Sequence, residues 1–197
     1  MQLEPYDEKA GYRCWLSQDE QEQIENYYSE NLERQLAVEL LLDGLRADEV
    51  IQVRKEDFRR METEQEGWML TIREGKTGHR ECPVSASTKT TAYALTSAQS
   101  LHQDEPILSY TTKTIQNWVD EAAAHFAAEK EEWDYVTAHD LRRTWATFTY
   151  YQLAGDRAKQ TVMSWGGWDS EQVFTSHYIG RVPDEIAISM MTEAGLV

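Results

Sequence analysis

Residues 137–147 are Thr-Ala-His-Asp-Leu-Arg-Arg-Thr-Trp-Ala-Thr, a stretch that joins a charged helix start to an apolar helix face. His139 and Arg142 stand three positions apart, so in a helix they share one face and can reach the same bound group. Three apolar residues repeat at helical spacing and predict core packing: Leu141, Trp145 and Phe148. The stretch predicts a helix with a buried side and a charged start.

Two segments upstream add further charged candidates. Residues 42–50, Leu-Asp-Gly-Leu-Arg-Ala-Asp-Glu-Val, place Arg46 just after a glycine that ends a helix, with Glu49 three positions later. Residues 75–80, Gly-Lys-Thr-Gly-His-Arg, lie between two short apolar runs and predict a hairpin turn that carries Lys76.

Two segments downstream carry aromatic candidates. Residues 165–168 are Trp-Gly-Gly-Trp, which predicts a turn ending in Trp168. Residues 177–180 are His-Tyr-Ile-Gly and hold the isolated Tyr178 in an otherwise helical tail.

The remaining pattern predicts a mainly α fold with a small three-stranded antiparallel β-sheet, an α+β class. Residues 1–15 are expected to form an N-terminal tail, and a short turn is expected near 170–175. Strands are predicted at 58–63, 68–72 and 80–84. Helices are predicted at 17–28, 32–42, 47–53, 88–101, 112–130, 139–153, 156–165 and 183–194.

Taken in order, these segments resemble the tyrosine recombinase (phage integrase) family, whose pattern runs Arg, hairpin Lys, His-x-x-Arg, His or Trp, and a nucleophilic Tyr. The resemblance covers about residues 16–178. Family members usually place the Tyr nine residues after the His or Trp, whereas Tyr178 stands ten after Trp168 and His177 stands nine after it. A one-residue insertion would restore the geometry, so Tyr178 is the expected nucleophile.

The resemblance implies a role for each candidate in an attack on a DNA phosphate. Arg46 and Arg142 would bind the non-bridging oxygens through charge-assisted hydrogen bonds. His139 would assist deprotonation of Tyr178, because a phenol with a pKa near 10 is a poor nucleophile at neutral pH. Lys76 would protonate the leaving 5′ oxygen.

Two further residues have supporting roles in this scheme. Trp168 would pack against the phosphate. Glu49 would not touch the phosphate but would orient the neighbouring side chains that do. The residues alone leave other readings open: Lys76 as an ordinary turn lysine, Trp168 as a core residue and Glu49 as a surface carboxylate. Neither a metal nor another cofactor is expected.

The same resemblance implies an organisation and a set of partners. Residues 1–197 are expected to form a single catalytic domain without the family's usual N-terminal DNA-binding domain, which a separate domain or accessory protein could replace. The expected partner is double-stranded DNA, bound by a homo-tetramer. The tail at 179–197 would pack into a neighbouring protomer through its apolar residues, or fold back on its own chain.

Charge is the feature that fits this picture least. Thirty-five acidic residues against nineteen basic ones give a net charge of −16, and an acidic surface repels phosphate. Taken by itself, this balance argues against a nucleic-acid partner. The alternative that we favour is salt adaptation of the halophile type, because molar salt screens repulsion beyond about 3 Å. The sequence shows no apolar run long enough for a membrane span and no signal peptide, and its two cysteines form no disulfide framework, so a cytoplasmic protein is expected.

Three classes of function remain open. The leading one is a site-specific recombinase that integrates or excises a mobile element or resolves replicons through a 3′-phosphotyrosine intermediate. The second is a catalytically silent DNA-binding module of the same fold. The third is a relaxing topoisomerase of the related type IB-like class.

Overall fold

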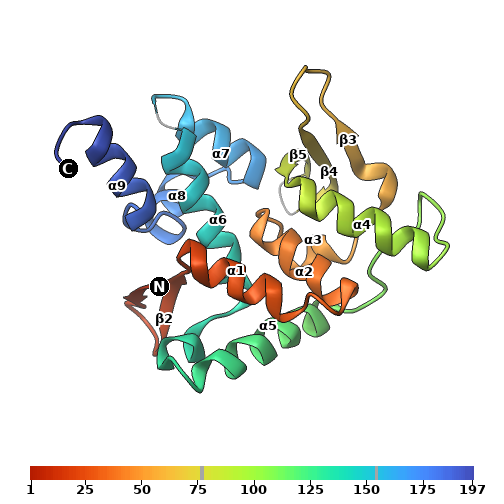
Figure 1. Cartoon of the computed structure of the whole chain (residues 1–197), viewed down its shortest axis with the longest axis horizontal. Helices are drawn as coiled ribbons and strands as arrows, with labels where there is room; N and C mark the ends of the chain where they lie inside the picture. The colour runs from red at the N-terminus through yellow and green to blue at the C-terminus, as the bar shows by residue number, and fades with distance from the viewer. Residues whose placement is uncertain (76–77, 154) are drawn as a thin grey trace.

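Helices make up most of the fold, and a three-stranded antiparallel sheet lies at one edge, as the sequence predicts (Figure 1). The computed structural model describes residues 1–75, 78–153 and 155–197. Its strands are β1 (Gln2–Pro5), β2 (Tyr12–Trp15), β3 (Phe58–Arg60), β4 (Trp68–Gly75) and β5 (Gly78–Val84). Its helices are α1 (Gln18–Tyr27), α2 (Leu32–Leu42), α3 (Ala47–Val50), α4 (Ala86–Ala98), α5 (Thr112–Ala127), α6 (Ala138–Leu153), α7 (Ala158–Gly166), α8 (Glu171–His177) and α9 (Asp184–Glu193), with 3-10 turns η1 (Lys55–Asp57) and η2 (Glu131–Tyr135).

Local sequence signals account for the starts and ends of the first helices. Ser17 and Glu20 form the predicted capping box that opens α1, each side chain bonding the other's backbone N–H. The next helix, α2, ends at Asp43, and Gly44 follows with a φ of +91° that favours glycine. The α2 helix is buried over most of its length and contacts α1, α4, α5 and α6, so it forms the centre of the core.

The sheet has the order β3-β4-β5, and α4 lies across it (Figure 1). The register pairs Phe58 with Leu70 and Leu70 with Cys82. Along β5 the side chains at Arg80, Cys82 and Val84 are buried, in the alternation expected of a half-buried strand. All three predicted strands are present, although β3 is shorter and β5 begins two residues earlier than predicted.

Two expectations for the ends of the chain are wrong. Residues 1–15 are not a tail, because β1 and β2 pair as an antiparallel hairpin with Leu3 opposite Cys14. Its second strand is buried against α6, where the Cys14 N–H donates to the Asp140 carboxylate at 3.0 Å. The short turn expected near 170–175 is the helix α8, whose buried Phe174 anchors it to the core. Within the described residues, no helix is long and apolar enough to cross a bilayer.

Glycines allow α6 and α7 to come close to their neighbours. A Cβ on Gly44 would lie 2.4 Å from the ring of Trp145 on α6. A Cβ on Gly166 would lie 1.9 Å from the ring of Trp168. Gly44 therefore sets how closely residues 42–46 approach α6, while Gly166 leaves room for the Trp168 ring, which stacks on Trp145 at 6.2 Å.

This close approach can be tested by comparing two glycines. Gly44→Ala is expected to lower the free energy of unfolding by about 2 kcal/mol more than Gly78→Ala, because overpacking costs roughly that amount. Both glycines have a φ of +91°, but a Cβ on Gly78 meets no described atom within 4 Å. Backbone strain therefore cancels in the comparison, which urea unfolding measures. Equal losses would contradict the packing argument.

Candidate functional site

Three of the predicted site residues, Arg46, His139 and Arg142, line one pocket, and Tyr178 lies beside His139. Arg46 is the residue before α3, His139 and Arg142 lie in the first two turns of α6, and Tyr178 follows α8. The polar residues that line this open pocket of about 370 Å³ are Arg46, Asp48, His139 and Arg142, together with Thr112 and Gln116 of α5. The structure therefore brings together residues that lie more than 90 positions apart in the sequence.

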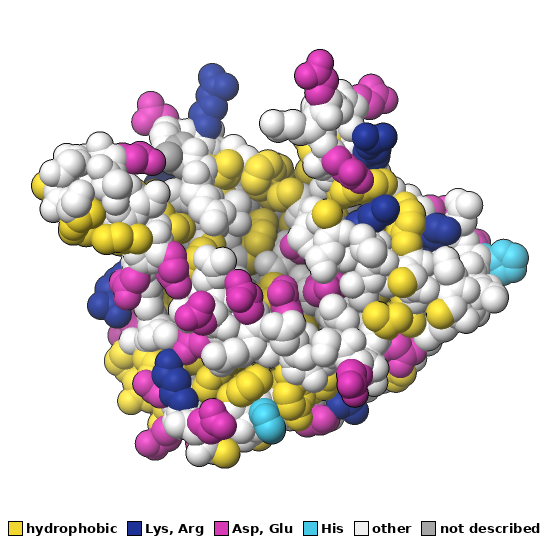
Figure 2. All heavy atoms as spheres, in the orientation of Figure 1, with side chains coloured by type: hydrophobic (Ala, Val, Ile, Leu, Met, Phe, Trp, Pro, Cys, Tyr) yellow, Lys and Arg dark blue, Asp and Glu magenta, His cyan; other side chains and the backbone are white. Residues whose placement is uncertain are grey.

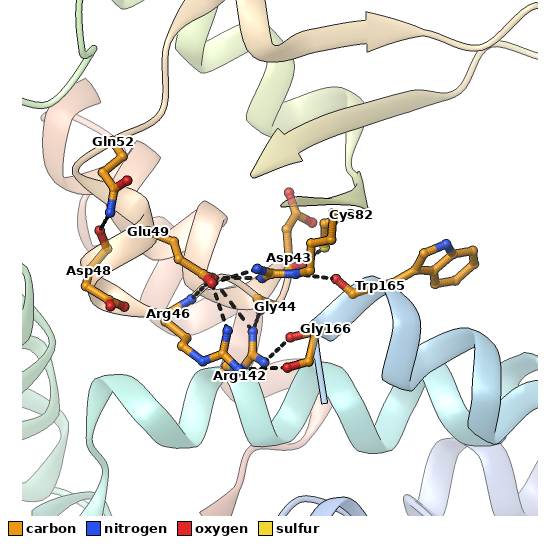
Figure 3. Close-up of polar contacts among 12 residues, drawn as sticks. Asp43, Gly44, Arg46, Asp48, Glu49, Gln52, Cys82, Arg142, Trp165 and Gly166 are labelled. Carbon is orange, nitrogen blue, oxygen red and sulfur yellow. Dashed lines mark hydrogen bonds and ion pairs between the residues drawn. The ribbon is translucent and has the colours of Figure 1, made fainter. Parts of the chain in front are cut away.

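Arg142 is fully buried at the base of this pocket. Its two terminal nitrogens donate to the carbonyl oxygens of Gly44 and Gly166, which fixes the plane of the guanidinium (Figure 3). Burial and the nearby charge of Arg46 lower the pKa of Arg142 to about 10, so it still carries its charge at neutral pH. Its Nε atom is buried and has no hydrogen-bond partner among the described residues. Arg142 is therefore a rigidly held cation whose Nε–H donor is used by no described residue.

Arg46 is held in place beside Arg142 by Glu49. The Glu49 carboxylate accepts from the Arg46 backbone N–H and from its Nη1, both at 2.8 Å. The Nη2 atom of Arg46 donates to the Gly167 carbonyl at 3.0 Å. Glu49 itself is buried, which rules out the alternative that it is a surface carboxylate.

Arg80 is the residue of this network that sequence reasoning missed. It lies on β5, and its Nη1 and Nη2 atoms donate hydrogen bonds to the two carboxylate oxygens of Glu49, at 2.6 and 2.8 Å. Its Nε donates to the Trp165 carbonyl at 2.7 Å. The signal was its position, because Arg80 shares the inward side of β5 with Cys82 and a buried arginine requires an acidic partner.

The electrostatics of Glu49 follow from this crowding by arginines. Burial acts to raise its pKa, but the hydrogen bonds and charge of Arg80, with further help from Arg46 and Arg142, lower the pKa to about 2. Figure 3 shows the bonds that converge on the Glu49 carboxylate from several segments. This carboxylate therefore stays ionised and holds the arginines together.

His139 and Tyr178 lie next to each other at the pocket, with ring centroids 5.2 Å apart. His139 keeps solvent exposure, yet desolvation by its neighbours and the charges of Arg143, Arg142 and Arg46 lower its pKa to about 3. His139 is therefore a neutral imidazole at pH 7 that can accept a hydrogen bond, and the same three charges make it a weak base while no anion is bound beside it.

Of the two adjacent residues His177 and Tyr178, only the tyrosine has its ring at this site. The Tyr178 ring centroid is 4.5 Å from that of Trp168 and 5.9 Å from the guanidinium carbon of Arg142. The His177 side chain instead meets Arg13, with 3.2 Å between its Nδ1 and Nη2 of Arg13. The ten-residue spacing thus places Tyr178, not His177, beside the arginines.

Trp168 belongs both to the core and to the site. It is buried, and its ring packs against Phe174 and Trp145. The guanidinium of Arg142 lies 4.2 Å from its ring centroid, a distance typical of a cation–π contact. Its indole nitrogen has no hydrogen-bond partner in the described part of the chain.

Two expectations are not tested by this geometry. Lys76 lies outside the described residues, so its predicted role stays a prediction. No three His, Cys, Asp or Glu side chains within 1–75, 78–153 and 155–197 are placed to hold a metal ion together. The expectation of metal-free chemistry likewise stays a prediction.

The buried carboxylate predicts a pH-dependent loss of stability. A folded-state pKa of about 2, against the ordinary glutamate value of 4.5, means that Glu49 stabilises the fold above about pH 4.5 and loses this effect as pH falls toward 2. Glu49→Gln is therefore expected to cost about 3 kcal/mol at pH 7 and to approach wild type near pH 2. Urea unfolding across this range measures the difference. Glu64→Gln, an exposed control, is expected to match wild type throughout, and a pH-independent deficit at Glu49 would contradict the argument.

Comparison with known proteins identifies the fold. No protein-family model matches the sequence, and no curated protein matches it. Among solved structures, XerA recombinase matches with a TM-score of 0.70 at 19% identity, covering 92% of this chain and 65% of that one. XerH site-specific recombinase in a post-cleavage complex on palindromic difH matches at 0.67 and 17%, covering 91% and 52%.

A third match is a lambda integrase dimer bound to a COC′ core site, with a TM-score of 0.64 at 19% identity, covering 89% of this chain and 51% of that one. The chain thus spans between about half and two thirds of each of these three proteins. The expected resemblance is confirmed at the level of the fold. The architecture of this chain is that of the tyrosine recombinase catalytic domain.

Proposed function

We propose that this chain is the catalytic domain of a site-specific DNA recombinase that cleaves and rejoins DNA through a phosphotyrosine at Tyr178. The observation that carries the proposal is the juxtaposition of the Tyr178 ring with neutral His139 and buried Arg142. A phenol, a proton acceptor and fixed cations are the groups that attack on a phosphodiester requires. The fold shared with XerA and lambda integrase supports the same reading.

The proposed reaction assigns one task to each group. Arg46 and Arg142 bind the non-bridging oxygens, whose negative charge increases as attack proceeds. His139 accepts the Tyr178 proton, and the phenolate oxygen forms a bond to phosphorus. The bond from phosphorus to the 5′ oxygen breaks, and that oxygen takes a proton from Lys76. Because the phosphotyrosine conserves the bond energy, the reverse attack by a 5′ hydroxyl rejoins the strand without ATP.

The C-terminal tail supports the proposed assembly on DNA. The α9 helix has no buried residue, and Figure 2 shows apolar side chains along its flank. Five apolar residues of the tail are exposed: Ile188, Met190, Met191, Leu196 and Val197. Of the two expectations for the tail, this exposure favours docking on a neighbouring copy over packing in cis. Double-stranded DNA, a tetramer that exchanges tails and a further DNA-binding domain or accessory protein remain parts of the proposal, as does a cytoplasmic location.

The central prediction concerns the nucleophile. Wild-type protein is expected to form a denaturant-resistant covalent complex with a nicked DNA substrate whose short 5′ fragment diffuses away, in buffer containing EDTA. Tyr178→Phe removes the attacking oxygen but keeps the ring, so the complex is expected to disappear while DNA binding is retained. Gel electrophoresis under denaturing conditions measures the complex, and a gel-shift titration measures binding.

The matched control is Tyr150→Phe, the same chemical change on α6, which is expected to leave the covalent complex unchanged. A covalent complex that persists in Tyr178→Phe would mean that another residue is the nucleophile. DNA binding without any covalent complex in the wild type would favour the catalytically silent module instead.

The acidic surface supports adaptation to high salt as a further proposal. Carboxylates are spread over the face drawn in Figure 2 rather than gathered in one patch. Many are exposed, and their mutual repulsion destabilises the compact state when it is not screened. The net charge of −16 makes this repulsion large at low ionic strength.

We therefore expect the melting temperature to rise by several degrees between about 0.1 M and about 2 M KCl, because screening shortens from about 10 Å to under 3 Å. Thermal unfolding followed by circular dichroism measures the change. A melting temperature that is highest at low salt would remove the proposed adaptation.

A further inference from the structure

The segment that carries Tyr178 has little packing of its own. The α8 helix buries only Phe174, and its other side chains are exposed. Tyr178 and the two residues after it are half-buried. One buried side chain holds this seven-residue helix at a single point, so contacts to the backbone of residues 177–180 fix the phenol together with the packing of its ring on Trp168.

The N-terminal hairpin supplies contacts to this segment. The indole Nε1 of Trp15, at the end of β2, donates to the Tyr178 carbonyl at 2.9 Å. The same carbonyl accepts from the Thr147 hydroxyl of α6 at 2.8 Å. Both lone pairs of the Tyr178 carbonyl oxygen are thus engaged, one by the hairpin and one by α6.

A second contact acts one residue earlier. Arg13 of β2 lies within hydrogen-bond distance of the His177 ring nitrogen, and Arg143 of α6 donates to the His177 carbonyl at 3.0 Å. Arg13 is buried, and its Nη1 is held by Glu4 of β1 at 2.8 Å. These contacts keep the His177 side chain on the hairpin side, away from Arg142.

The hairpin is itself attached to the helix that carries the site. The Leu16 N–H donates to the Thr144 hydroxyl at 2.9 Å, and the Cys14 N–H donates to Asp140. The chain beyond Tyr178 passes close to the indole, since a Cβ on Gly180 would lie 2.9 Å from the Trp15 ring. The hairpin, α6 and residues 177–180 therefore form one connected unit.

We propose that Trp15 and Arg13 are positioning residues, which hold residues 177–178 in the register that presents Tyr178 rather than His177 to the phosphate. This inference rests on the proposed role of Tyr178 as nucleophile. It explains how a chain with one extra residue after Trp168 keeps the phenol beside His139 and Arg142. Neither positioning residue touches the reacting atoms.

The test removes the indole N–H together with part of the buried Trp15 ring, and the control makes the same chemical change elsewhere. Trp15→Phe keeps an aromatic ring but cannot donate to the Tyr178 carbonyl, and its control is Trp68→Phe, whose indole donates to Glu66 at an exposed site. With the nicked substrate, Trp15→Phe is expected to lower the first-order rate of covalent-complex formation about tenfold, since small misplacements of a nucleophile are costly. The dissociation constant for DNA is expected to stay at the wild-type value.

A second variant and a second measurement guard against a simple loss of folding. Arg13→Lys keeps the charge beside Glu4 but loses the fork that also reaches His177, and it is expected to act in the same direction. Hydrogen exchange of the peptide covering residues 175–182 is expected to be about tenfold faster in Trp15→Phe, with α6 unchanged. A role limited to overall stability would instead speed exchange throughout the chain.

The outcomes separate this proposal from the proposed function. Unchanged exchange at residues 175–182 in Trp15→Phe overturns the positioning role, whether or not DNA is cut. Faster local exchange with an unchanged cleavage rate also overturns it. If the wild type forms no covalent complex on any nicked substrate, the proposed function fails, and the exchange measurement alone still decides whether the hairpin holds the segment.

Discussion

The site depends on one buried carboxylate that is shared between arginines from different parts of the chain. Glu49 accepts from Arg80 on the sheet and from Arg46 before α3, and it lies 4.0 Å from Arg142 on α6. Without this anion, three guanidiniums would repel one another in a poorly solvated space. With this anion in place, the guanidinium groups of Arg46 and Arg142 can lie side by side and give the pocket a net positive charge. The Glu49 carboxylate therefore determines the positions of the arginine side chains and holds them there.

This arrangement reconciles an acidic protein with the proposed phosphate-binding role of the site. The net charge of −16 describes the whole surface, whereas a bound phosphate meets the few groups within a Debye length. The charged groups that line the pocket are Arg46, Arg142 and Asp48, and the ion pair of Glu49 with Arg80 lies behind them, while His139 is neutral because its pKa is low. The three arginines outnumber the two carboxylates, so the local charge is positive. Local charge can thus differ in sign from the global balance, and composition alone gives a poor guide to the partner.

Much of the fold could be predicted from the sequence because its signals are local. The capping box at Ser17, the glycine at position 44 and the alternation on β5 each specify an element without reference to distant residues. The His139 and Arg142 pair follows from helical spacing in the same way. These are the parts of the prediction that the structure reproduces.

The rest depends on contacts between distant segments, which no local pattern contains. The hairpin at residues 1–15 lacks the apolar alternation that would predict a strand pair. It is stabilised instead by hydrogen bonds to Asp140 and Thr144 of α6, which lie far away in the sequence. Arg80 lies on β5, and its acidic partner Glu49 is 31 positions away in the sequence. The role of Arg80 depends on the sheet lying beside α3 in the folded chain.

The bond from Trp15 to Tyr178 joins residues 163 positions apart, and it has a consequence for how the protein is made. Contacts of such long sequence separation form late, because the intervening chain has to be closed first. A ribosome releases the N-terminal hairpin long before the segment it binds. The Tyr178 ring therefore reaches its position only after nearly the whole chain has been synthesised and residues 177–178 have met the folded hairpin.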